Sequence, residues 1–140
     1  LNSDTSFLQL NETPPAGVVY AGTYYGSPVA KGSAIAGIHH PGGDMQKLSV
    51  GVLSGFVQCS NGICDDSSDS SNGFYGVNWT QGTSEQGSSG SALFNTIGSA
   101  RYVTGSLYGG RADCSAPNAQ DWYGRFDVPY KAKIKQWLNP

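Results

Sequence analysis

Charged side chains, histidines and long apolar runs are all scarce in this sequence of 140 residues. Charged residues make up only 13% of the chain and the net charge is −2, which leaves no basic surface for nucleic acid or an anionic membrane. No apolar run approaches the roughly 20 residues of a membrane-spanning helix. The three cysteines and two histidines lack the spacing of a zinc site. We therefore expect no nucleic acid, no membrane, no metal and no cofactor.

Glycine, serine and aromatic residues are plentiful, and tight-turn sequences such as PGGD and SNG separate short apolar runs. These runs have the length and composition of strands, and no helical pattern lies between them. They cover residues 18–25, 33–39, 47–57, 74–79, 91–94, 102–108 and 122–128. The pattern predicts an all-β domain, either an antiparallel barrel or a sandwich.

The end of the chain has helical spacing instead. Tyr130, Ile134, Trp137 and Leu138 form one apolar stripe over residues 128–138. Asp127 stands where it can cap this helix, and the proline two residues later suits the first turn. We expect a C-terminal helix that packs its stripe onto the β-domain.

The start of the chain reads differently. LNSDTSFLQL has the pattern of a strand, and NETPPAG is a proline-rich linker. A strand followed by a linker is typical of the end of a preceding domain. We expect residues 1–16 to belong to such a domain and residues 17–140 to form one further domain.

The cysteines favour an exported protein. Cys59 and Cys64, in CSNGIC, can close a short disulfide loop through an Asn-Gly turn. Cys114 is then left over. An odd cysteine in an exported chain implies a partner in another molecule or in an absent part of the same one.

The stretch QGTSEQGSSGSALF places a Ser-Gly turn before an apolar strand. A serine hydroxyl becomes a nucleophile only when a base takes its proton and donors await the oxyanion. Here Ser89 offers the hydroxyl, and the N–H groups of Gly87 and Ser89 offer the donors. By itself such a turn is more often a flexible loop. No histidine follows Ser89, which excludes the order of an α/β-hydrolase, and the absence of βαβ units excludes a subtilisin arrangement.

Five stretches in order carry a family resemblance: SDTSFLQL, GIHHPGGD, EQGSSGSALF, GSLYGGRADCS and QDWYGRFDV. Together they resemble the C-terminal part of a chymotrypsin-fold, trypsin-like serine protease, above all the bacterial lysyl endopeptidases. The resemblance implies the second, Greek-key β-barrel of that fold, with residues 1–16 as the last strand of the N-terminal barrel plus its linker. It also implies secretion by a bacterium and a polypeptide substrate.

The resemblance gives roles to the serine turn. Ser89 would be the nucleophile, Asp4 the triad acid, and the N–H groups of Gly87 and Ser89 the oxyanion hole. The triad histidine would lie on the absent N-terminal barrel, to which Cys114 would be bonded, so the isolated chain should be inactive. His39 and His40 would lie on a strand away from the triad, one packed inward and one solvated.

The same resemblance bears on the substrate. Thr83 stands six residues before the nucleophile, where trypsin-like proteases carry an acid, whereas Asp121 matches the pocket acid of lysyl endopeptidases. Tyr108 would wall the pocket in place of their histidine, and Gly109 and Gly110 would leave room for the substrate side chain. A buried carboxylate favours a cationic partner, hence cleavage after Lys or Arg. The alternative function is a non-catalytic binding module of protease descent.

Overall fold

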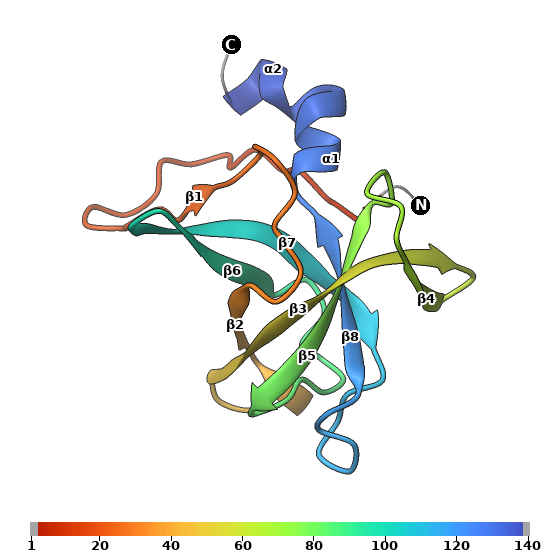
Figure 1. Ribbon diagram of the computed structural model, residues 1–140. Coiled ribbons are helices and arrows are strands. Elements are labelled where there is room, and N and C mark those ends of the chain that lie inside the picture. The colour runs from red at the N-terminus through yellow and green to blue at the C-terminus, as the bar shows by residue number, and fades with distance from the viewer. Residues whose placement is uncertain (1–2, 139–140) are drawn as a thin grey trace.

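The computed structural model describes residues 3–138 as a closed β-barrel with a C-terminal helix above one end (Figure 1). Six antiparallel strands pair in the cyclic order β2-β3-β5-β8-β7-β6, and β6 pairs again with β2. Because the ladder closes on itself, the domain is a barrel and not a sandwich, and the predicted all-β class is confirmed. The barrel strands are β2 (Ala34–His39), β3 (Lys47–Ser60), β5 (Phe74–Gln81), β6 (Ala92–Ile97), β7 (Ala100–Gly110) and β8 (Gln120–Arg125).

Two short strands are added to the barrel. β1 (Gly22–Thr23) lies parallel to β7, and β4 (Ile63–Ser67) forms a hairpin with the far end of β3. The hairpin turns at Asn61 and Gly62, both of which have positive φ, as an Asn-Gly turn requires. Cys59 and Cys64 face each other across it and form the predicted disulfide.

Aromatic and branched side chains fill the barrel. Leu53, Val77 and Leu93 are almost entirely buried. The rings of Trp79 and Tyr123 meet edge to face at 6.3 Å, a favourable arrangement for aromatic pairs. An added Cβ at Gly37 would come within 2.9 Å of the Trp79 ring. The glycine is therefore what allows β2 to pass this bulky pair.

Two predicted strands are shorter than expected or do not form. Residues 3–10 adopt no strand, and Leu8 and Leu10 are 81% and 68% exposed; Leu1 and Asn2 lie outside the described residues. Of residues 18–25, only Gly22–Thr23 pairs with a neighbour. An apolar pattern becomes a strand only where a ladder partner satisfies its backbone, and within residues 3–138 these segments lack one over most of their length.

The C-terminal helix begins at Asp127, one residue earlier than predicted, and is described to Leu138. It runs through α1 (Asp127–Pro129), a π-type turn η2 (Tyr130–Ile134) and α2 (Lys135–Leu138). Tyr130 and Ile134 are buried, but Trp137 and Leu138 are 63% and 49% exposed. Only the first half of the predicted stripe therefore packs on the barrel. None of the helices within residues 3–138 is long and apolar enough to cross a membrane.

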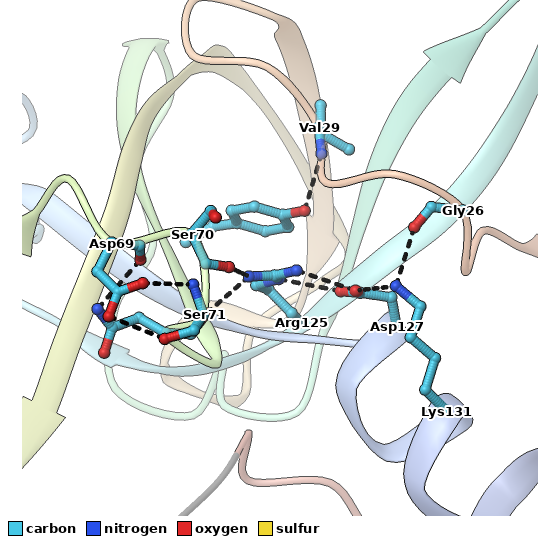
Figure 2. A network of polar contacts seen from close by, with 10 residues as sticks. Gly26, Val29, Asp69, Ser70, Ser71, Arg125, Asp127 and Lys131 are labelled. Atoms are coloured by element: carbon cyan, nitrogen blue, oxygen red, sulfur yellow. Dashed lines mark hydrogen bonds and ion pairs between the residues drawn. The ribbon is translucent and has the colours of Figure 1, made fainter.

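A buried ionic network fastens this helix to the barrel (Figure 2). Arg125 donates two hydrogen bonds of 2.9 Å to the Asp127 carboxylate and two more to the carbonyl oxygens of Ser70 and Asn72. Lys131 Nζ lies 2.9 Å from Asp127 Oδ2. Burial alone would raise the pKa of Asp127, but the hydrogen bonds and charges of Arg125 and Lys131 outweigh it and lower that pKa. The predicted cap is wrong: the carboxylate pairs with two cations and caps no helix N–H.

Candidate active site

The Ser-Gly turn lies in residues 82–91, which connect β5 to β6. Gly87 and Gly90 have φ of +94° and +81°, a region that favours glycine. The turn is fastened to β7, because Gly90 N donates to Leu107 O at 2.8 Å and Leu107 N donates to Ser91 O at 2.9 Å. Its backbone is therefore shaped by two glycines and held by the neighbouring strand.

Ser89 is exposed at the tip of this turn. Within residues 3–138 its hydroxyl has no hydrogen-bond partner, and the N–H groups of Gly87 and Ser89 have no acceptor. The adjacent amides are bonded: Ser88 N donates to Glu85 O at 3.0 Å, and Ser91 N donates to Ser88 O at 3.1 Å. Two unused donors thus border an exposed hydroxyl, which is the donor set that an oxyanion needs.

As predicted, one of the two histidines packs inward and the other is in solvent: His39 is buried and His40 is exposed. The expectation that both lie away from the predicted triad does not describe His39, which contacts the residue before Ser89. His39 Nδ1 is 2.9 Å from Ser88 Oγ, and its Nε2 is 3.0 Å from Ser49 Oγ. Ser49 Oγ in turn donates to Thr83 O at 3.0 Å. Burial lowers the pKa of the His39 ring. The ring therefore contacts the residue before the predicted nucleophile and not the nucleophile itself.

Asp4 lies on the surface, in a segment that passes close to the serine turn. The preceding Ser3 is buried, and its carbonyl presses on Gly124, where an added Cβ would clash with it. Asp4, Gly90 and Gly105 are among the residues that line one pocket of about 290 Å³. The segment of Asp4 and the residue after Ser89 therefore border the same hollow.

Asp121 lies on β8 with no exposed surface. Its Oδ2 accepts hydrogen bonds from Trp79 Nε1 at 2.7 Å and Ser84 Oγ at 2.6 Å, and its Oδ1 accepts one from Ala112 N at 3.2 Å. All three donors are neutral, and within residues 3–138 no cation forms an ion pair with this carboxylate. Burial raises the pKa of Asp121, and the hydrogen bonds offset this only in part. Gly110 faces the carboxylate so closely that an added Cβ would collide with Oδ1.

The other predicted substrate residues have different surroundings. Thr83 is half-buried and adjoins Ser84, and its hydroxyl donates to the Ser84 carbonyl at 3.3 Å. Tyr108 sits where β7 slips in register against β8, and its ring packs 5.3 Å from that of Phe74, beside the disulfide hairpin. Gly109 borders open space, since an added Cβ would have no neighbour within 4 Å. Of these residues, only Gly110 lies directly against Asp121.

The sequence did not predict the residues that form hydrogen bonds with Asp121 and His39. Trp79 and Ser84 bind the Asp121 carboxylate, and Ser88 and Ser49 bind the His39 ring. The alternation of β5 could have placed Trp79 inside the barrel. No local pattern relates any of these residues to a partner 10 to 49 positions away, so the pairings had no sequence signal.

Cys114 is exposed and has a free thiol. A hydrogen bond and negative charge from Glu85 raise the pKa of this thiol. Within residues 3–138, no three His, Cys, Asp or Glu side chains are grouped so that they could hold a metal ion.

The six-stranded barrel, its C-terminal helix and the glycine-framed serine turn define the second barrel of a chymotrypsin-fold serine protease. The family model for the lysyl endopeptidase C-terminal domain matches residues 1–124, and the chain belongs to this family. The lysyl endopeptidase of Pseudomonas aeruginosa is 38% identical over 140 residues, which cover 98% of this chain and 28% of that protein. The chain thus spans little more than a quarter of its relative.

A solved structure agrees with the fold. The crystal structure of the inactive form of the Rv3671c protease superposes with a TM-score of 0.54, covering 82% of this chain and 53% of that one. The identity between the two is 15%, so this likeness shows the fold alone.

Proposed function

We propose that this domain supplies the C-terminal half of the active site of a secreted bacterial serine endopeptidase that cleaves after Lys or Arg. One observation carries the proposal of hydrolysis. The exposed Ser89 hydroxyl lies beside two backbone N–H groups, of Gly87 and Ser89, that have no acceptor within the described chain. Family membership supports the reaction class, because the relative is a lysyl endopeptidase.

In the proposed reaction the Ser89 oxygen attacks the scissile carbonyl carbon and its proton passes to a histidine on the preceding barrel. Asp4 orients that histidine. The N–H groups of Gly87 and Ser89 bind the oxyanion as it forms. The C–N bond then breaks, the histidine returns the proton to the leaving amine, and water hydrolyses the acyl-enzyme.

The substrate class follows from Asp121. A carboxylate that is buried among neutral donors lacks the compensating charge that buried acids normally have. An ammonium or guanidinium that enters beside Gly109 supplies this charge and favours ionisation of the acid. Gly110 places no side chain against the carboxylate, and the uncharged Thr83 and Tyr108 add no competing charge.

Two features support a preceding barrel as the partner. Phe7 and Trp137, 44% and 63% exposed, border a hollow of about 580 Å³ between residues 3–7 and the C-terminal helix. Large exposed apolar side chains around a hollow are typical of a covered surface. The exposed thiol of Cys114 is available for a disulfide to that barrel, with residues 1–16 as its last strand and linker.

A fluorophosphonate probe tests the function. The Ser89 oxygen bonds to phosphorus as fluoride leaves, so the mass of the protein rises by the phosphonyl group. We expect labelling of the longer protein that carries the preceding barrel, none of the isolated chain, and none of the longer Ser89→Ala variant. Labelling of the isolated chain would show that the base lies within it. No labelling of either form would favour the non-catalytic binding module.

A further inference from the structure

A relay of buried hydrogen bonds ends one residue before Ser89. Glu85 N donates to Ser88 Oγ at 3.3 Å, and Ser88 Oγ contacts His39 Nδ1 at 2.9 Å. His39 Nε2 contacts Ser49 Oγ at 3.0 Å, and Ser49 Oγ donates to Thr83 O at 3.0 Å. As residues, Ser88, His39 and Ser49 are only 1%, 2% and 1% exposed, so water does not compete for the bonds among their side chains.

The Thr83 end of the relay fixes which nitrogen of His39 must carry a proton. A backbone N–H can only donate and a carbonyl can only accept. Because the Ser49 proton goes to Thr83 O, the Ser49 oxygen must accept from His39 Nε2–H. Burial lowers the pKa of the His39 ring and so favours its neutral form. In that form Nδ1 carries a lone pair and accepts the proton of Ser88, and the ring is protonated on Nε2 alone.

The relay connects the two ends of the serine turn by hydrogen bonds. It joins Thr83, where the loop leaves β5, to Ser88, which immediately precedes the nucleophile, through a ring on β2. The turn is also bonded to the segment after β2, because Gly42 N donates to Gln86 O at 2.7 Å. We propose, on the basis of the proposed function, that His39 is a positioning residue that fixes the Ser89 hydroxyl and the oxyanion donors through Ser88.

This role is separate from that of a base. Both ring nitrogens of His39 are occupied by Ser88 and Ser49, and neither reaches the Ser89 hydroxyl. Loss of the ring leaves the Ser88 proton without its acceptor and frees the backbone before Ser89. A small displacement of reacting groups lowers rates by on the order of 100-fold. The effect should fall on the rate of reaction at Ser89 and spare the affinity for the probe.

The test uses fluorophosphonate labelling of the longer protein. We expect Ser88→Ala and His39→Ala each to lower the maximal labelling rate by about 10- to 100-fold, with an unchanged half-saturating probe concentration. The double variant should be no slower than the worse single one, because both break one unit. Ser88→Thr keeps the hydroxyl and should recover most of the rate. His40→Ala is the matched control, since that ring is exposed and, among the described residues, its side-chain bond is to the carbonyl of Asp44.

A second measurement does not depend on catalysis. Nitrogen-15 NMR of the unmodified protein at neutral pH should show that His39 is protonated on Nε2 and unprotonated on Nδ1. A folded Ser88→Ala variant that labels at the original rate would overturn the positioning role, and a proton on Nδ1 would overturn the relay itself. If the unmodified protein does not label at all, the proposed function fails and the positioning role fails with it. The spectrum would then decide only whether the relay exists.

Discussion

The two ends of strand β8 each hold a buried aspartate, and their surroundings are opposite. Asp127, just beyond the strand, is paired with Arg125 and Lys131, which lower its pKa (Figure 2). Asp121, near the start of the strand, is bonded within residues 3–138 only to the neutral donors Trp79, Ser84 and Ala112, and burial raises its pKa. In this part of the chain the Asp127 carboxylate has cationic partners, and the Asp121 carboxylate has none.

This difference is the basis for assigning Asp127 to the fold and, in the proposed function, Asp121 to substrate recognition. The Asp127 network joins the helix, the end of β8 and the loop before β5. The charge of Asp127 is therefore paired with cations that hold the fold together. Asp121 is held just as firmly but remains without a counter-ion in the described chain. Under the proposed function, this uncompensated buried acid is where a cationic substrate side chain would bind.

Removal of the cation beside Asp127 should have the largest effect. Arg125→Met leaves the carboxylate buried with only the half-exposed Lys131 and removes the donors to two carbonyl oxygens. Breaking a buried pair in this way costs about 3–5 kcal/mol. We expect a loss of that size in the free energy of unfolding, measured by urea denaturation.

Lys131→Met is the matched control, because the same carboxylate loses its more exposed partner, whose side chain is 56% exposed. Exposed pairs contribute about 0–1 kcal/mol. Equal losses in the two variants would contradict the assignment of the network to Arg125.

The corresponding change at the other acid should act on substrate choice more than on stability. Asp121→Asn removes a charge that has no partner in the free domain, so the neutral side chain is tolerated, although its amide faces the Ala112 N–H. We expect kcat/KM for Lys substrates of the longer protein to fall about 100-fold, on the order of 2.7 kcal/mol. Substrates with a neutral side chain at that position should lose much less. A parallel loss for both substrate types would mean that Asp121 only supports the pocket.

Most of the fold could be predicted because its signals are local. Alternating apolar runs between glycine turns placed the strands of the barrel, and the Asn-Gly turn at residues 61–62 placed the disulfide hairpin. The prediction was wrong where a local pattern depends on a distant partner. Residues 3–10 have a strand pattern but no ladder within the described chain, and Asp127 has the position of a cap but lies within reach of Arg125.

The site was predictable only in part for the same reason. Ser89 and Gly87 stand out in a short motif, and the family resemblance directed attention to Asp121. The His39 ring illustrates what was out of reach. Strand alternation predicted that one of His39 and His40 packs inward, but the bond of His39 to Ser88 joins residues 49 positions apart and depends on how the barrel closes.

The smallest effect is the opposite pH dependence of the two acids. The folded-state pKa of Asp127 is lowered, so its stabilisation is present above the unfolded pKa of about 3.9 and is lost as the pH falls through the folded value. The folded-state pKa of Asp121 is raised, so its ionisation destabilises the fold increasingly as the pH rises from about 3.9 through the folded value. Relative to the unmodified protein, Asp121→Asn should therefore gain stability as the pH rises, and Asp127→Asn should lose it. Urea denaturation across a pH series measures both differences, and carboxyl carbon-13 titration should give a higher midpoint for Asp121 than for Asp127. A reversed order of midpoints would show that Asp121 already has a cation, and the distinction between the two ends of β8 would then disappear.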